Sequence, residues 1–264
     1  MDKKRTLNFE VSDRQALPQY LARVLIALEI VTVALALWSL SGSYRVEAMP
    51  FLGAVIGTLA VLALSALSAN AFVSERVNQT FEVLLTTPLR ATDIVRQKAR
   101  MLTRFAWVLA APMMTLFFLE WWMRRDPEGW WHWGTASPSL YLLCSVLTLA
   151  VYLPLVLWLS LWIGLKMRTR IRAIVTALAV IVGWCVVPAI ADTMFDPRPD
   201  DWWNAPLNFS CPLAIPFSNE SGQLPDLHAG PPWLVVSINF LIYTATVLAI
   251  RHRCLSRADA YLRG

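Results

Sequence analysis

The sequence predicts an all-α polytopic membrane protein with six transmembrane helices, and three observations support this fold class. Of its 264 residues, 57% are hydrophobic and only 16% are charged, whereas about a quarter of the residues of a soluble domain are charged. Six apolar segments reach or approach the length of about 20 residues that a spanning helix needs. The basic residues gather on one side of these segments. We therefore expect a single transmembrane domain over residues 1–264.

The expected spans define the elements in chain order. Residues 1–20 are polar and predict a cytoplasmic interface segment before the first span. The spans themselves are Leu21–Leu40, Phe51–Val73, Phe105–Trp122, Leu140–Leu165, Ile174–Ile190 and Trp233–Ile250. The second, fourth, fifth and sixth contain no Asp, Glu, Lys or Arg. Three of the spans carry an internal proline, which removes a main-chain hydrogen bond and bends a helix: Pro112, Pro154 and Pro188.

The distribution of charge predicts the orientation of the chain. All but four of the 23 Lys and Arg residues lie before or at the start of the first span, between the second and third, between the fourth and fifth, or after the sixth. The exceptions are Arg45, Arg124, Arg125 and Arg198. The positive-inside rule then places both termini in the cytoplasm of an inner or plasma membrane. The net charge of +5 is explained by this topology, so we expect membrane lipid and no nucleic acid as a partner.

Two polar residues in the spans are candidates for a translocation path or a subunit seam. Glu29 lies well inside the first span, where a carboxylate is costly unless it faces protein or water. It either lines such a path or seam, or is a protonated or hydrogen-bonded packing residue. Asn70 ends a run of small residues in the second span that favours close helix packing. That run comprises Gly53, Gly57, Ser65 and Ser68.

Residues 74–104 form a charged cytoplasmic segment between the second and third spans. Its first part has apolar residues at i, i+4, i+7 and i+8, which is one face of a helix: Val77, Phe81, Leu84 and Leu85. Pro88 ends this helix, because the residue before a proline avoids the helical region. Thr92 or Asp93 can cap a second helix that runs through Lys98 into the third span. This pattern predicts a rigid surface element that docks on a soluble partner.

The same segment resembles a pattern of the membrane subunits of type-2 ABC exporters, E-R-x-x-G-T-L-E-L-L-L-x-T-P-L followed by an acidic residue, I-V and a lysine. Here it reads Glu75-Arg76, Thr80-Phe81-Glu82, Leu84-Leu85, Thr87-Pro88-Leu89, Asp93-Ile94-Val95 and Lys98, with Gln79 and Gln97 in place of two glycines. Its position after the second of six spans, and the long outer segment before the last span, are also similar to the family.

The resemblance implies a permease subunit that pairs with a second permease subunit, as a homodimer or a heterodimer. Each subunit would dock on a cytoplasmic P-loop ATPase that binds ATP and Mg and drives export of an unidentified substrate. Residues 192–232 would form an extracytoplasmic cap with short helices. The implied ATPase-coupling residues are Glu75, Arg76, Thr80, Phe81, Glu82, Leu84, Leu85, Thr87, Pro88, Leu89 and Asp93.

Several functions lack the residues that they need. None of the ten glycines lies in the GxxxxGK[ST] pattern that cradles phosphates, so we expect no ATP hydrolysis, and no cofactor, in this chain. The histidines His132, His228 and His252 lie in loops or at a span edge, and no HExxH pattern is present. We nominate no catalytic or metal-binding residue. Two alternatives to the exporter stay open: a non-transporting membrane anchor or scaffold for a cytoplasmic ATPase or another partner, and a secondary transporter.

Overall fold

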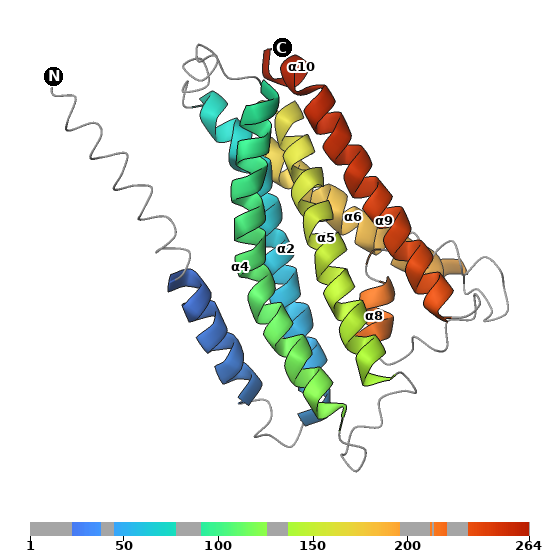
Figure 1. Ribbon diagram of the computed structural model, residues 1–264. Coiled ribbons are helices and arrows are strands. Elements are labelled where there is room, and N and C mark those ends of the chain that lie inside the picture. Colours follow the sequence, from blue (N-terminus) through green and yellow to red (C-terminus); the bar gives the residue numbers. More distant parts are fainter. Residues whose placement is uncertain are drawn as a thin grey trace.

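A computed structural model describes residues 23–37, 45–77, 91–125, 137–195, 212, 214–220 and 232–263. Within these residues every regular element is a helix. A helix over residues 23–37 precedes α2 (Arg45–Val77), α4 (Ala91–Met123), α5 (Pro138–Lys166), α6 (Arg170–Phe195), α8 (Ala214–Glu220), α9 (Pro232–Ser256) and α10 (Ala258–Arg263). The long helices form one bundle around α5, which packs against α2, α4, α6 and α9 (Figure 1).

Four of these helices are long and apolar enough to cross a membrane. They cover Met49–Val73, Ala91–Met123, Pro138–Lys166 and Arg170–Pro188, and they contain most or all of the second to fifth predicted spans. Within the predicted first span, residues 23–37 are helical, and the rest of that span lies outside the described residues. The predicted sixth span lies in α9. The structure therefore supports a helical membrane protein, while six crossings remain a prediction.

The helices extend beyond the apolar limits set from the sequence. α2 and α4 each have 33 residues, which at about 1.5 Å per residue makes each about 50 Å long, against about 30 Å for the hydrocarbon core. Because α4 begins at Ala91, Thr92 and Asp93 lie within its first turn, and the prediction that one of them caps the helix is wrong. The helices also continue through Pro112, Pro154 and Pro188.

The closest approach within the bundle joins α2 to α5. A Cβ atom added to Gly164 would overlap the main-chain carbonyl of Ala69, so only glycine allows this separation. One helical turn away on each helix, the hydroxyls of Ser65 and Ser160 form a buried hydrogen bond of 3.0 Å. Ser68 is also fully buried. The predicted close packing in this half of the second span is therefore confirmed.

The glycines of the GxxxG spacing have a smaller part in this packing. A Cβ on Gly57 would lie 3.2 Å from the Cε of Met113 in α4, and a Cβ on Gly53 would meet nothing within 4 Å. Small residues allow helices to approach only where a neighbouring backbone faces them. In the part of the chain that the structure describes, the neighbouring backbone faces Gly164.

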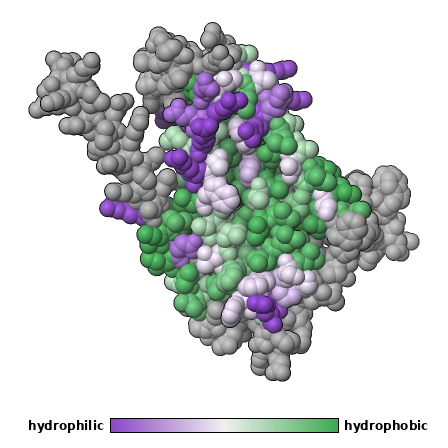
Figure 2. Space-filling view, in the orientation of Figure 1, coloured by the Kyte–Doolittle hydropathy of each residue, from purple (hydrophilic) through white to green (hydrophobic). Residues whose placement is uncertain are grey.

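The surface of the bundle agrees with a membrane setting. Figure 2 shows a broad hydrophobic surface over the middle of the molecule and hydrophilic residues gathered toward the end that carries α10. Large apolar side chains point outward on every long helix, among them Phe51, Trp107, Leu143, Val187 and Leu241. In water such a surface would be strongly unfavourable, whereas lipid tails solvate it without cost.

Candidate functional site

The predicted coupling residues lie around the junction of α2 and α4. Glu75 and Arg76 belong to the last turn of α2, and Asp93 is exposed in the first turn of α4. The other predicted coupling residues fall within residues 78–90, outside the described part of the chain: Thr80, Phe81, Glu82, Leu84, Leu85, Thr87, Pro88 and Leu89. The structure thus shows the two helices that this segment connects, and the coupling role itself remains a prediction.

An apolar cluster joins the ends of α2 and α4. Phe72 of α2 and Val95 of α4 are both 0% exposed, and Ile94 is 4% exposed. The cluster also contains Leu161 of α5 and Ala258 of α10. Five helices, α2, α4, α5, α9 and α10, therefore contribute to the apolar cluster at this end of the bundle, and the Ile-Val pair of the sequence motif is part of it.

Lys98, the last residue of the motif, adds a polar contact to this junction. Its Nζ donates a 3.0 Å hydrogen bond to the main-chain oxygen of Ala71 in α2 and lies 5.7 Å from the centre of the Phe72 ring. A hydrogen bond from a charged donor is stronger than one between neutral groups. The second half of the motif therefore fastens the start of α4 to the end of α2.

The basic residues gather at the same end of the bundle. They lie at the start of α4, between α5 and α6, on the last turns of α9 and at the start of α10. The ends of α4, α5, α9 and α10 meet in the apolar cluster. In the described part of the chain these basic residues include Arg96, Lys98, Arg100, Arg104, Lys166, Arg168, Arg170, Arg172, Arg251, Arg253 and Arg257. Arg124 and Arg125 lie at the opposite end, after α4. This separation of charge has the form that the positive-inside rule describes.

Glu29 is hydrogen-bonded to the neighbouring helix. It is half-buried in the helix over residues 23–37, and the hydroxyl of Thr115 in α4 lies 2.9 Å from its Oε2. The hydroxyl can also donate to the main-chain oxygen of Ala111, at 3.1 Å. Of the two interpretations of Glu29, the hydrogen-bonded packing residue has direct support. A role in a translocation path or subunit seam remains a prediction.

Asn70 is half-buried on α2, and its Oδ1 is buried without a hydrogen-bond partner among the described residues. The Oγ of Ser68 nearby is in the same condition. An unsatisfied buried polar atom costs about 1–3 kcal/mol. Oδ1 of Asn70 can accept a further hydrogen bond, and the hydroxyl of Ser68 can donate or accept one. The assignment of Asn70 to a path or seam stays a prediction.

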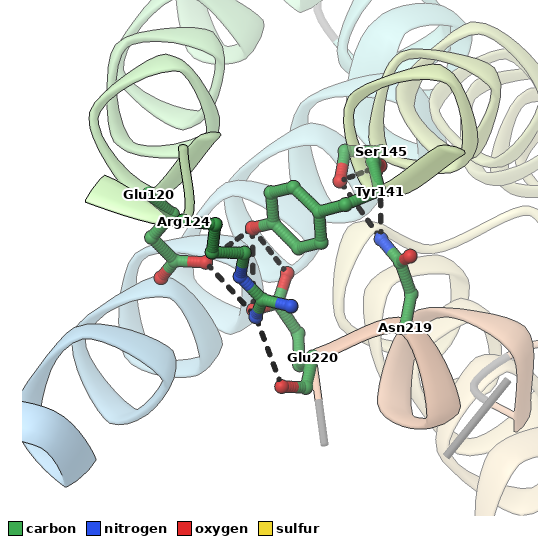
Figure 3. A network of polar contacts seen from close by, with 6 residues as sticks. All are labelled: Glu120, Arg124, Tyr141, Ser145, Asn219 and Glu220. Atoms are coloured by element: carbon green, nitrogen blue, oxygen red, sulfur yellow. Dashed lines mark hydrogen bonds and ion pairs between the residues drawn. The ribbon is translucent and has the colours of Figure 1, made fainter. Parts of the chain in front are cut away.

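A second group of polar residues, which the sequence analysis missed, lies at the other end of the bundle. Tyr141 near the start of α5 points between Glu120 of α4 and Glu220 of α8 (Figure 3). Its hydroxyl is hydrogen-bonded to Glu120 and lies 3.1 Å from Oε1 of Glu220. Arg124 stacks on the Tyr141 ring, with its Cζ 3.9 Å from the ring centre. We call Glu120, Arg124, Tyr141 and Glu220 the carboxylate cluster.

Arg124 is the cation of this cluster. Its Nη2 lies 3.9 Å from Oε2 of Glu120 and donates a 3.2 Å hydrogen bond to the main-chain oxygen of Glu220. Glu120 is 6% exposed. The loss of hydration on burial, together with the negative charge of Glu120, raises the pKa of Glu220 to about 9, although Arg124 and Tyr141 act in the opposite direction.

Asn219 attaches α8 to α5 beside the carboxylate cluster. Its Nδ2 donates to the Oγ of Ser145 at 2.9 Å and lies 3.2 Å from the main-chain oxygen of Tyr141. Ile215, one turn earlier in α8, is 1% exposed and packs against Cys144, Val236 and Phe240. One face of α8 is therefore buried on α5 and α9.

The sequence contained a signal for this cluster. Glu120 lies inside the predicted third span, where an acidic residue requires a partner. Its partners could not be identified from the sequence, because Tyr141 and Glu220 follow it by 21 and 100 positions. The cluster can hold protons and bind cationic groups. Among the described residues no group of three His, Cys, Asp or Glu side chains could hold a metal ion.

The fold and these sites define an all-helical membrane protein with a basic, tightly packed end and a buried carboxylate cluster at the other. Comparison with protein-family models, with curated proteins and with solved structures finds no match for this chain.

Proposed function

We propose that this chain is the membrane subunit of a type-2 ABC exporter. In this proposal a separate cytoplasmic P-loop ATPase binds ATP and Mg, docks on residues 74–104, and drives export through a path that forms with a second permease subunit. The chain itself supplies no catalytic residue and no cofactor site. The observation that carries the proposal is the attachment of motif residues Ile94, Val95 and Lys98 to the end of α2.

This attachment makes the junction suitable for transmitting movement. Residues 78–90 connect α2 to α4, and the two helices are held together next to this connection by Phe72, Val95 and Lys98. Close-packed interiors resist local deformation and move as rigid bodies. A partner that displaces residues 78–90 would therefore tilt α2 and α4 together, rather than bend the connection alone.

The charge distribution supports the side on which the partner would dock. Basic residues surround the junction on α4, α6 and α9, and the positive-inside rule favours the cytoplasm for such an end. We place the chain in an inner or plasma membrane with this end, and both termini, in the cytoplasm. The P-loop ATPase and its nucleotide would then be on the same side as residues 74–104.

The test is coupled ATP hydrolysis. The full chain, purified from its own membranes through an affinity tag and reconstituted in lipid nanodiscs, should carry a P-loop ATPase whose turnover the chain stimulates. Leu85→Asp places a charge on the apolar face of the predicted coupling helix and should reduce this stimulation by at least about tenfold. A Gly-Gly replacement of Thr87 and Pro88 should act similarly by removing the rigid turn.

The control is Ile171→Asp, the same kind of change at a residue that is 77% exposed at the start of α6. It should leave both expression and stimulation unchanged. The proposal fails if no P-loop ATPase accompanies the chain, or if Leu85→Asp retains full stimulation. A scaffold that only recruits the ATPase would give another result, because the turnover of the ATPase would then be the same with and without the chain.

A further inference from the structure

The carboxylate cluster has one more negative charge than positive charge if both of its carboxylates are ionised. Among the residues that the structure describes, the charged or titratable groups that face Glu220 are Glu120 and Arg124 at the end of α4 and Tyr141 on α5. Arg124 can balance one of the two carboxylates. Removing an unbalanced charge from water costs several kcal/mol, so the docked position of α8 favours one additional proton in the cluster.

A count of hydrogen atoms gives the same result. The hydroxyl of Tyr141 has one hydrogen, yet its oxygen is within hydrogen-bond distance of Glu120 and of Glu220. It can donate to only one of them. With both carboxylates ionised, the other contact would bring two acceptor oxygens together. A proton on Glu220 resolves this conflict, because Glu220 then donates to Tyr141 and Tyr141 donates to Glu120.

The position of α8 depends on these contacts. α8 has only seven residues, and isolated helices of this length are unstable in water. It is held on α5 and α9 by Ile215 and Asn219, and at its last residue by Glu220. Glu220 is the titratable group among these three, so its protonation state can decide whether the end of α8 stays docked.

We propose that Glu220 holds a proton that completes a hydrogen-bond chain from Glu220 through Tyr141 to Glu120, and that loss of this proton releases α8 from the ends of α4 and α5. The cluster is thus a proton-binding site that controls a short helix over one end of the bundle. The inference does not depend on the proposed exporter function, since the cluster lies at the end opposite the α2–α4 junction.

The raised pKa of Glu220, about 9 against an ordinary value of 4.5, supports this proposal and sets its pH window. Because the docked state raises this pKa, the contribution of Glu220 to docking is fully present below pH 4.5 and is lost as the pH rises through about 9. Between pH 4.5 and about 9, the release of α8 is accompanied by the loss of one proton from Glu220. The ratio of docked to released α8 therefore falls by up to about tenfold per pH unit.

The proton itself can be detected by infrared spectroscopy of the full protein in nanodiscs at neutral pH. A protonated carboxylic acid has a carbonyl band that ionised carboxylates lack. We expect this band in the wild-type protein and its loss in Glu220→Gln. The matched control is Asp93→Asn, at an exposed acidic residue on the other end of the bundle, which should leave the band unchanged. A wild-type spectrum identical to that of Glu220→Gln in this band would overturn the proposal.

Release of α8 can be followed by fluorine NMR with 4-trifluoromethylphenylalanine in place of Phe217, which is 70% exposed on α8. In otherwise wild-type protein, a second signal should replace the first with a midpoint above neutral pH and no higher than about pH 9. Glu220→Gln and Glu120→Gln each leave one carboxylate for Arg124 and should keep the first signal across the titration. The proposal is wrong if the otherwise wild-type protein shows no transition, or if both variants titrate in the same way as it does.

Discussion

The contact between Gly164 and Ala69 predicts that a single methyl group destabilises the bundle. In Gly164→Ala the new Cβ would overlap the main-chain oxygen of Ala69 and lie only 3.0 Å from its carbonyl carbon. The obstacle is backbone within a long helix, so no side-chain rotation relieves it. α5 must instead move away from α2, and this movement stretches the buried hydrogen bond between Ser65 and Ser160.

The size of the effect follows from opposing contributions. Overpacking of a well-packed interior costs about 1–3 kcal/mol, and weakening the serine hydrogen bond adds about 1 kcal/mol. Alanine has a higher helix propensity than glycine, which offsets these costs by about 1 kcal/mol. We expect a net loss of about 1–3 kcal/mol, which lowers the Tm of a chain of this size by roughly 3–10 °C.

Thermal unfolding of the full protein in nanodiscs, followed by tryptophan fluorescence, measures this loss. The matched control is Gly183→Ala in α6, where an added Cβ meets nothing within 4 Å. That substitution gains helix propensity without a clash, so its Tm should stay the same or rise. A loss of Tm in Gly164→Ala without a loss in Gly183→Ala is the result that the structure requires. Equal shifts in one direction would refute the close approach of α2 and α5 at Gly164.

Two further predictions concern single hydrogen bonds and use the same assay. Lys98→Met removes the hydrogen bond from Nζ to the main-chain oxygen of Ala71 and should lower the free energy of unfolding by about 1–2 kcal/mol. The control Arg96→Met, at an exposed position, should leave it unchanged. Equal stability of the two variants would contradict the contact. Ser160→Ala leaves Ser65 without its serine partner and should cost about 0.6 kcal/mol, and a rise in Tm would show that this bond does not stabilise the bundle.

The membrane class and the approximate helix positions could be predicted because they depend on local composition. The predicted span Leu140–Leu165 differs from α5 (Pro138–Lys166) by only a few residues, since apolar residues continue almost to both helix ends. The hydropathy limits fit α4 (Ala91–Met123) less well, and its part before Phe105 was predicted instead from the helix that runs through Lys98 into the third span. Helical hydrogen bonds continue past the membrane surface, so hydropathy alone underestimates such a helix.

The two candidate sites differ in how far the sequence could reveal them. The predicted coupling segment could be proposed from the sequence because its residues are close together and follow a helical period. The carboxylate cluster was missed, although Glu120 was visible inside a predicted span. Its partners come from α5 and α8, far along the chain, and no local pattern connects them. The same holds for Glu29, whose hydrogen bond to Thr115 joins residues 86 positions apart.

The sequence by itself determined that this chain is helical, that it has the character of a membrane protein, and that its basic residues gather beside a motif between two apolar segments. These properties depend on composition and on short-range periodicity. Only the tertiary structure decided that Gly164 faces the backbone of Ala69, that Lys98 joins α4 to α2, and that two carboxylates meet at one tyrosine hydroxyl. Such contacts depend on how distant helices pack, because each requires two chain segments to come within a few ångströms of one another.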